Sequence, residues 1–200
     1  MNEQKSAPVR RKKRSQLAEI WRRMRRNRLA MLGLAVVVIL ILVAVFADQI
    51  ADYDTVVIKQ DVVHRFQGPS AEHWFGTDEL GRDIFARLVH GARISLLVGV
   101  VAVAIALATG GTLGAIAGYF GGVVDNVIMR VMDVFLSIPI LLLAIMIVAA
   151  LGSSMTNLMI AIGLASMPTF ARVVRASVLS VKDQEFVEAA RAIGATNGHI

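Results

Sequence analysis

The sequence predicts an all-α, polytopic membrane protein, a helical bundle with four spans within its 200 residues. Apolar residues make up 56% of the chain and charged residues only 18%, whereas a soluble domain of this size carries about a quarter charged residues. Four long stretches have almost no charge, and a block of basic residues stands directly before the first of them. Uncharged stretches of this length are typical of membrane-spanning helices.

Residues 1–28 are expected to form a basic cytosolic tail that ends in an interfacial amphipathic helix. Eleven of the 21 Lys and Arg residues lie here. Leu17, Ile20, Trp21 and Met24 follow the i, i+3, i+4, i+7 spacing of one helical face. The segment can therefore lie in the headgroup layer and contact anionic lipid, or it can simply flank the first span. Its position beside a span favours membrane lipid as its partner and disfavours nucleic acid.

Residues 29–47 are the first predicted transmembrane helix. As a helix, this uncharged stretch rises roughly 29 Å, which is enough to cross the hydrocarbon core. It is longer than the apolar part of a signal peptide, so we expect an uncleaved anchor. The basic residues before it place the amino terminus in the cytosol. Residues 48–93 are then an extracytoplasmic segment, and Gly68-Pro69 is typical of a loop.

Residues 94–200 are expected to hold three further spans, near 94–117, 134–151 and 158–174. The first of these carries small residues at strict i+4 spacing, which line up as a ridge along one side of a helix. A second helix can approach such a ridge closely. The ridge contains Ala102, Ala106, Gly110, Gly114, Gly118 and Gly122, although the last two can belong to a turn instead.

Caps and charges predict the connections between these spans. Asp125 is expected to cap the following helix, and Arg130 and Asp133 are expected to pair at i, i+3. Pro139 should kink the third span, and Pro168 should bend the fourth.

The ends of the fourth span are predicted in the same way. Gly152-Ser153-Ser154 supplies the outer turn, and Thr156 or Asn157 can cap the helix that follows. The basic residues Arg172, Arg175 and Lys182 then mark a return to the cytosol.

A short helix near residues 183–200 carries the pattern Glu188-Ala189-Ala190, with Gly194 four positions after Ala190. The two alanines allow a partner's backbone to approach closely, and Glu188 provides a directional charge. Gly194 permits a sharp helix end. A cytosolic helix docked in a groove can transmit rigid-body motion from a soluble motor to membrane helices. By itself the pattern also fits an ordinary amphipathic helix.

A second polar motif lies before the second span. Asp78, Gly81, Arg82 and Asp83 are expected to form a capped turn that opens a helix, with local pairs made by Arg82 and Asp83. The functional alternative is an outward gate or a contact with an extracytoplasmic binding protein. Spacing alone favours the structural role.

Three ordered segments resemble permease subunits of the dipeptide and oligopeptide ABC importers, a family that also includes nickel importers. They are 75-FGTDELGRDIFARLVHGARISLLVG-99, 118-GYFGGVVDNVIMRVMDVFLSIP-139 and 21-WRRMRRNRLAMLGL-34, and the last is similar to the start of the second, "C"-type subunit. Glu188, Ala189, Ala190 and Gly194 match the family's EAA motif. The distal part of that motif and two further spans are missing, so we expect a fragment or a form truncated at the carboxyl end.

The resemblance implies a type I ABC importer permease that forms half of a translocation pathway for peptides or similar small solutes. The implied partners are a second homologous permease, two cytosolic ATPase domains coupled through the EAA helix, and an extracytoplasmic substrate-binding protein. The implied location is the cytoplasmic (inner) membrane of a bacterium or archaeon. The sequence does not distinguish dipeptide, oligopeptide and nickel-complex substrates.

The residue types disfavour other classes of protein. The chain has no phosphate loop, so we expect no enzymatic activity of its own and assign ATP hydrolysis to partner subunits. No cofactor is expected, and the scattered His64, His73, His90 and His199 predict no metal site. No ionisable residue lies in the middle of a predicted span, which disfavours the remaining alternative, a secondary transporter or channel.

Overall fold

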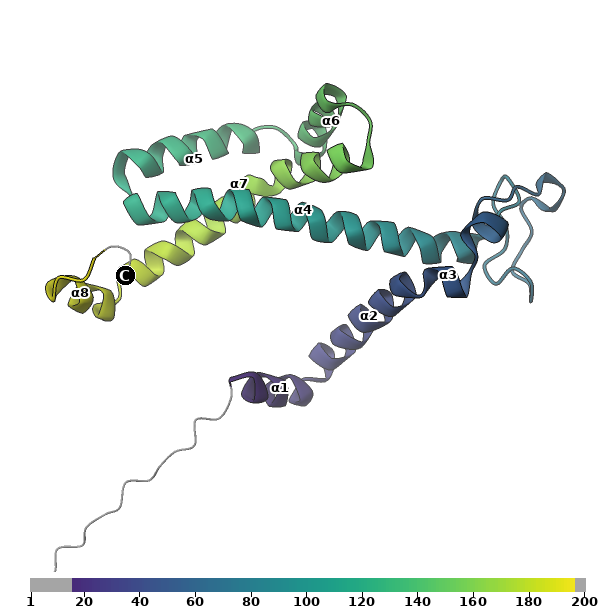
Figure 1. Cartoon of the computed structure of the whole chain (residues 1–200), viewed down its shortest axis with the longest axis horizontal. Coiled ribbons are helices and arrows are strands. Elements are labelled where there is room, and N and C mark those ends of the chain that lie inside the picture. Colours follow the sequence, from purple (N-terminus) through teal and green to yellow (C-terminus); the bar gives the residue numbers. More distant parts are fainter. Residues whose placement is uncertain (1–15, 197–200) are drawn as a thin grey trace, which may run out of the picture. The chain divides into compact units, whose positions relative to one another are not determined.

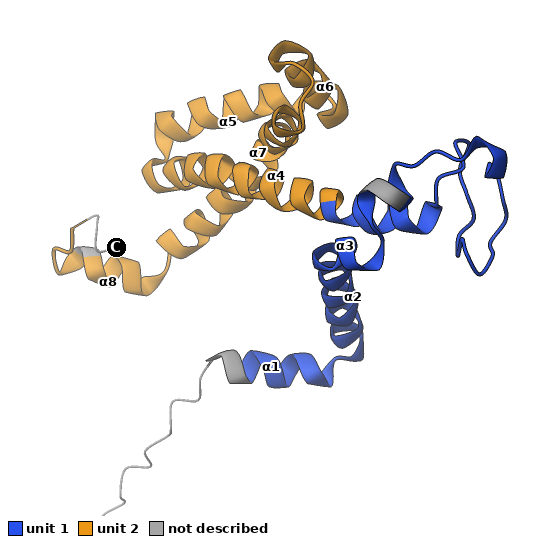
Figure 2. Ribbon diagram, turned by 45° about the vertical axis from the view of Figure 1, so that its right-hand side comes forward, with its two compact units in different colours: residues 1–93 blue, residues 94–200 orange. Residues whose placement is uncertain are grey.

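The computed structural model describes residues 16–196, apart from the side chains of residues 16–18, 54, 55 and 191. The basic tail before residue 16 and the last four residues of the predicted 183–200 segment lie outside this range, as does the side chain of Leu17. Throughout the described range the regular elements are helices, which confirms the predicted all-α class. The chain divides into two compact units, residues 1–93 and 94–200 (Figure 2).

The first unit begins with two helices separated by one residue. Asn27 lies between them, and its side-chain oxygen accepts a hydrogen bond from Ala30 N at 3.2 Å, which caps the second helix. The elements of this unit are α1 (Gln16–Arg26), α2 (Arg28–Val45), α3 (Ala47–Ile50), the π-helical turn η1 (Tyr53–Val57), the 3-10 turn η2 (Val62–His64) and the first ten residues of α4.

The second unit consists of the rest of α4 and four further helices (Figure 1). Their bounds are α4 (Ile84–Phe120), α5 (Gly122–Leu136), α6 (Ile140–Leu151), α7 (Met155–Lys182) and α8 (Glu185–Ala192). In both views α4 and α5 run beside α7 (Figures 1 and 2). Apolar clusters join α7 to its neighbours: Leu143 and Ala144 of α6 pack on Ala161 and Ala165, and Met132 of α5 packs on Met167 and Ala171.

Helix α4 begins at Ile84, ten residues before the predicted start of the second span. The prediction placed the boundary at the last charged residue, Arg93. The helix extends past that residue because Asp83 caps it, accepting a hydrogen bond from Ala86 N at 2.8 Å. Its 37 residues rise about 56 Å, which is well beyond the thickness of the hydrocarbon core.

The predicted third span, 134–151, is not one helix. Residues 134–136 end α5, and α6 starts at Ile140 after a bend of 91°. Pro139 lacks the N–H that a continuous helix needs, so a break rather than a mild kink forms at this point. Among the described residues, three helices are long and apolar enough to cross a membrane, or four if the bent pair counts as one span. Pro168 lies inside α7, which continues through it.

Three local predictions were wrong. Gly121, with a φ of +64°, is the residue that precedes α5, so Asp125 lies within the first turn of that helix and does not cap it. Asp133 pairs with Arg172 of another helix, not with the neighbouring Arg130. Ser154, rather than Thr156 or Asn157, caps α7 by accepting a hydrogen bond from the backbone N of Asn157 at 3.0 Å.

Candidate functional site

The ridge of small residues on α4 lies against the backbone of α7. A Cβ atom added at Gly110 would lie 2.2 Å from the carbonyl oxygen of Met167, and one at Gly114 would lie 2.2 Å from that of Ala171. At Gly118 the nearest atom is Cβ of Val178, at 2.9 Å. Ala102 and Ala106 are buried farther along α4. Glycine is therefore required where the two helices approach most closely.

Gly122 lies outside this contact. It has a φ of +53° and open space around its Cβ position, and with Gly121 it forms the turn between α4 and α5. Two consecutive glycines suit this turn because a left-handed backbone costs glycine no steric energy. Lys182, at the end of α7, donates a hydrogen bond from Nζ to the carbonyl oxygen of Tyr119 at 2.8 Å. The end of α7 is thus tied to the end of α4.

Helix α8 is attached to this end of the unit by one apolar side chain. Val187 is only 3% exposed. It lines a cavity of about 380 Å³ together with Tyr119 of α4 and five residues of α7: Val174, Ser177, Val178, Val181 and Lys182. Only two residues, Asp183 and Gln184, separate α7 from α8. Helix α8 is therefore joined to α7 both by a short linker and by the contact of Val187.

The predicted motif residues lie on and after α8. Glu188 and Ala189 are exposed, and Ala190 is half-buried. Gly194 has a φ of +83°, and Ala195 N donates to the carbonyl oxygen of Ala190 at 3.0 Å. That bond and the left-handed glycine form a Schellman motif, which ends the helix sharply as predicted from Gly194.

The outer side of α8 is apolar and has no covering element in the described part of the chain. Phe186 is 61% exposed and Ile193 is 86% exposed. Phe186 and Ala189 fall at i and i+3 on α8, so they share one face of the helix, and Ile193 follows its last residue. This face points away from Val187 and is available for a partner.

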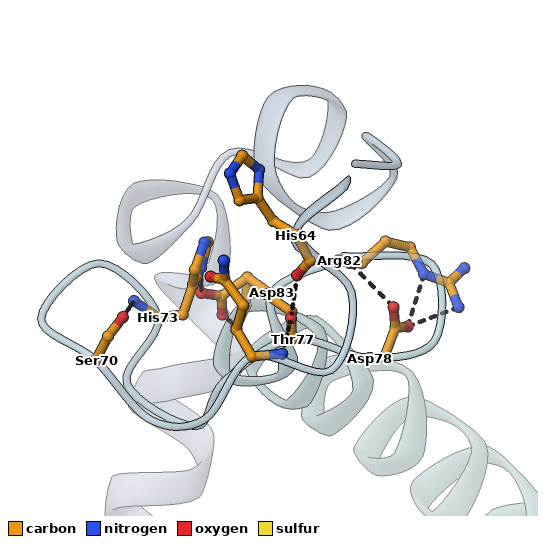
Figure 3. A network of polar contacts seen from close by, with 9 residues as sticks. His64, Ser70, His73, Thr77, Asp78, Arg82 and Asp83 are labelled. Atoms are coloured by element: carbon orange, nitrogen blue, oxygen red, sulfur yellow. Dashed lines mark hydrogen bonds and ion pairs between the residues drawn. The ribbon is translucent and has the colours of Figure 1, made fainter. Parts of the chain in front are cut away.

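At the other end of α4, Asp78 organises the predicted polar turn (Figure 3). Its carboxylate accepts hydrogen bonds from the backbone N of Leu80 at 2.8 Å and of Arg82 at 2.9 Å, and it forms ion pairs with the side chains of Arg82 and Arg87. Burial alone would raise the pKa of Asp78, but these hydrogen bonds outweigh burial and lower the pKa to about 2.

Gly81 and Asp83 join this turn to the loop before it. Gly81 has a φ of +72°, and a Cβ there would lie 1.7 Å from the carbonyl oxygen of Asp61. The buried Asp83 caps α4 with one oxygen and contacts His73 Nδ1 with the other, at 2.8 Å. Buried Thr77 donates to the carbonyl oxygen of His64 at 2.6 Å (Figure 3). The four predicted residues therefore form one structured turn.

Spacing in the sequence did not identify His73 or Asp61 as parts of this turn. Both lie in the preceding loop, and their contacts depend on how that loop folds back. The loop also exposes large apolar side chains: Val62, Val63, Phe66, Trp74 and Phe75. Phe66 has a φ of +54°, an uncommon conformation for a bulky residue. The exposed aromatic side chains among these are Phe66, Trp74 and Phe75.

Two ion pairs connect α5 to α7, and sequence analysis missed both. Arg175 Nε and Nη2 donate to the two carboxylate oxygens of Asp125 at 2.5 Å each. Arg172 Nη2 donates to Asp133 Oδ1 at 2.6 Å. The paired residues are 39 and 50 positions apart in the sequence, so local spacing does not reveal them. The only hint was two acids and two arginines bordering apolar stretches.

Comparisons with known families identify the family of the chain. Residues 110–200 match the family described as the binding-protein-dependent transport system inner membrane component. Residues 15–69 match the N-terminal TM domain of oligopeptide transport permease C. The chain belongs to the family of binding-protein-dependent permeases of ABC importers and is a multi-pass membrane protein. Within that family it is a "C"-type subunit of the dipeptide and oligopeptide group.

Individual relatives lie in the same group. The chain is 48% identical over 182 residues to the dipeptide transport system permease protein DppC of Alkalihalophilus pseudofirmus. It is 49% identical over 179 residues to the glutathione transport system permease protein GsiD of Escherichia coli. These matches cover 91% and 90% of the chain, and the chain spans 59% of the length of each relative.

Proposed function

We propose that this chain acts as a permease subunit of an ATP-driven importer and forms half of a pathway for peptides or similar small solutes. The observation that carries the proposal is α8: a short helix seated on α7 through Val187, with an exposed apolar outer face. Family membership supports it, because the relatives are named as dipeptide and glutathione permeases.

In this proposal α8 is the coupling helix, and a cytosolic ATPase binds its outer face. Ala189 lets the backbone of the ATPase approach, and Glu188 offers it a directed charge. Ala190 packs inward, and Gly194 ends the helix. The chain holds no nucleotide site in this scheme, and two partner ATPase domains perform the hydrolysis. A second homologous permease supplies the other half of the pathway.

On the opposite side, the loop before α4 is proposed to meet an extracytoplasmic substrate-binding protein. The turn of Asp78, Gly81, Arg82 and Asp83 gives the loop a fixed shape, because its polar groups are satisfied internally. The exposed Phe66 and its apolar neighbours then supply the contact area. The polar turn supports this surface and need not itself touch the partner.

The orientation proposed here places the amino terminus, α8 and the α4–α5 turn in the cytosol of a bacterium or archaeon. Helix α1 supports it, since Arg22, Arg23, Arg25 and Arg26 are carried by a helix that ends two residues before α2 begins. Ile20 and Trp21 are exposed on α1. Such a helix suits the headgroup layer of an anionic membrane.

Reconstitution of the full-length protein with its ATPase, second permease and binding protein tests the proposal. ATP-driven peptide uptake into proteoliposomes is expected from the wild type. Gly194→Val should strain the left-handed backbone and misplace the helix end, and Glu188→Lys should reverse the charge on α8. We expect both variants to hydrolyse ATP with little uptake. Gly99→Val, at a position with open space, is the matched control and should keep uptake.

The same assay separates the competing class. A secondary transporter or channel would move solute without nucleotide and would not respond to Glu188→Lys. Uptake by the wild type that is independent of ATP would overturn the proposal.

A further inference from the structure

Two ion pairs join α5 to α7 at different positions along the helices. Arg175 grips Asp125 with two parallel hydrogen bonds of 2.5 Å, and the Asp125 side chain is only 15% exposed. A bidentate arginine–carboxylate pair fixes orientation as well as distance. The second pair, Arg172 with Asp133 at 2.6 Å, is more open.

Two ion pairs between α5 and α7 resist a rotation of one helix about the other, which a single pair would allow. The carboxylates are eight residues apart on α5 and the arginines three residues apart on α7. Met132 of α5 packs between these helices against Met167 and Ala171. Breaking the Asp125–Arg175 pair would leave a poorly solvated carboxylate, because the Asp125 side chain is only 15% exposed. The two pairs therefore fix both the register and the rotation of α5 against α7.

The other face of α7 is fixed as well. Gly110 and Gly114 let α4 approach its backbone, and Lys182 ties its last turn to Tyr119. Helix α8 follows α7 after two residues and is held to it by Val187. A displacement of α8 therefore acts on a packed group of helices that consists of α4, α5 and α7. Of these three helices, α5 ends at Leu136, just before the break that precedes α6.

We propose that the Asp125–Arg175 and Asp133–Arg172 pairs are positioning residues for coupling. They clamp α5 to α7, so that a displacement of α8 moves both helices together. This inference rests on the proposed function, because it assigns the pairs a role in transmitting the ATPase motion. It assigns them no contact with substrate or nucleotide.

Charge reversal and charge exchange test the clamp in the reconstituted full-length importer. The readout is the number of substrate molecules taken up per ATP hydrolysed, which a purely structural defect in folded protein would not move. Asp125→Arg and Arg175→Asp should each lower this ratio about tenfold, within the usual range of coupling between sites. The double variant, with the charges exchanged, should restore most of it.

The second pair should behave in the same way with a smaller loss, because both of its side chains are about half exposed. The matched control is Asp48→Arg with Arg93→Asp. That pair, at 2.9 Å, also joins two helices but lies in the other unit. Its single and double variants should leave the ratio unchanged.

If a reversal variant fails to insert, the charge-removing Asp125→Asn and Arg175→Gln variants replace it. Thermal unfolding of both singles and the double in detergent then gives a double-mutant cycle. Non-additive stability with a lowered uptake ratio supports the clamp.

The failures are distinguishable. A wild type without ATP-driven uptake overturns the proposed function. A coupled wild type, with folded single variants that keep its uptake ratio, overturns the clamp alone. An exchange variant that stays uncoupled also overturns it, because restored charge complementarity would then have had no effect.

Discussion

At Gly114 a methyl group would lie 2.2 Å from the carbonyl oxygen of Ala171, and backbone atoms cannot rotate away as a side chain can. Gly111, three residues earlier on the same helix, offers a matched comparison. Its nearest neighbour would be a flexible leucine methyl at 3.5 Å, an ordinary contact. The two positions separate the effect of helix contact from the effect of helix propensity.

We expect Gly114→Ala to destabilise the protein by about 1–3 kcal/mol through overpacking, while Gly111→Ala is neutral or slightly stabilising. Thermal unfolding in detergent measures the difference in stability between the two variants. The height of the size-exclusion peak that remains after heating monitors the unfolding. Equal melting temperatures for the two variants would contradict the close approach of α4 and α7.

The lowered pKa of Asp78 predicts how the stability of the polar turn depends on pH. Its pKa of about 2 lies below the ordinary value of 3.8, so ionised Asp78 stabilises the turn above about pH 4. That stabilisation is lost as the pH falls through about 2. The ¹³Cγ resonance of Asp78 should titrate with a midpoint near 2. Between pH 5 and 8 the amides of Leu80 and Arg82 should keep their hydrogen-exchange protection.

Asp78→Asn is the control for this titration, because it keeps the side-chain shape and removes the charge. It should lower the exchange protection of those amides between pH 5 and 8, where wild-type Asp78 is ionised. A midpoint near 3.8 in the wild type would show that the hydrogen bonds do not favour the carboxylate.

Sequence reasoning at the residue scale worked where one element carries all the information. The i+4 spacing of Ala102, Ala106, Gly110 and Gly114 indicated a ridge before any partner was known. It failed for Asp125 and Asp133, because local spacing favoured a nearby cap and a nearby pair. Their actual partners depend on how α5 and α7 approach, which one segment of sequence does not encode.

At the scale of elements, the attachment of α8 to α7 depends on the side chain of Val187. Val187→Asp would place a charge in the apolar cavity shared with Tyr119 and Val181, so α8 should detach from α7. Phe186→Ala changes only the exposed side and should leave α8 seated. Hydrogen exchange of the α8 amides should therefore rise in Val187→Asp and stay at the wild-type level in Phe186→Ala.

Both variants are expected to reduce uptake in the reconstituted importer, for different reasons. Phe186→Ala would weaken ATPase binding to the outer face, which a pull-down of the ATPase measures directly. Slow exchange in both variants would show that Val187 does not hold the helix.

Element boundaries show which physical signals the sequence contains. The existence of helices near each apolar stretch followed from composition. The start of α4 did not follow from composition. The predicted capped turn before it marks this start, because Asp83 caps the helix. Pro139 indicated a distortion, but its size of 91° depends on the packing of α6 against Ala161 and Ala165.

For the whole molecule, the lack of cysteine makes topology directly measurable. Single cysteines can be introduced as Ser70→Cys and Asp183→Cys without removing any other cysteine from these 200 residues. A membrane-impermeant maleimide should label Ser70→Cys on intact spheroplasts and should label Asp183→Cys only after permeabilisation. The reverse pattern would invert the proposed orientation and remove α8 from the reach of a cytosolic ATPase.

The bend between α5 and α6 also bears on where water can go. Helix α6 has 12 residues and rises about 18 Å, less than the roughly 30 Å hydrocarbon core. Around Ser137–Pro139 the helical ladder of hydrogen bonds is interrupted, and lipid tails offer bare carbonyl groups no donors. Irregular backbone persists at membrane depth only against protein or a hydrated cavity. In the proposed topology, the corner between these helices is therefore expected to face protein or water and not lipid tails.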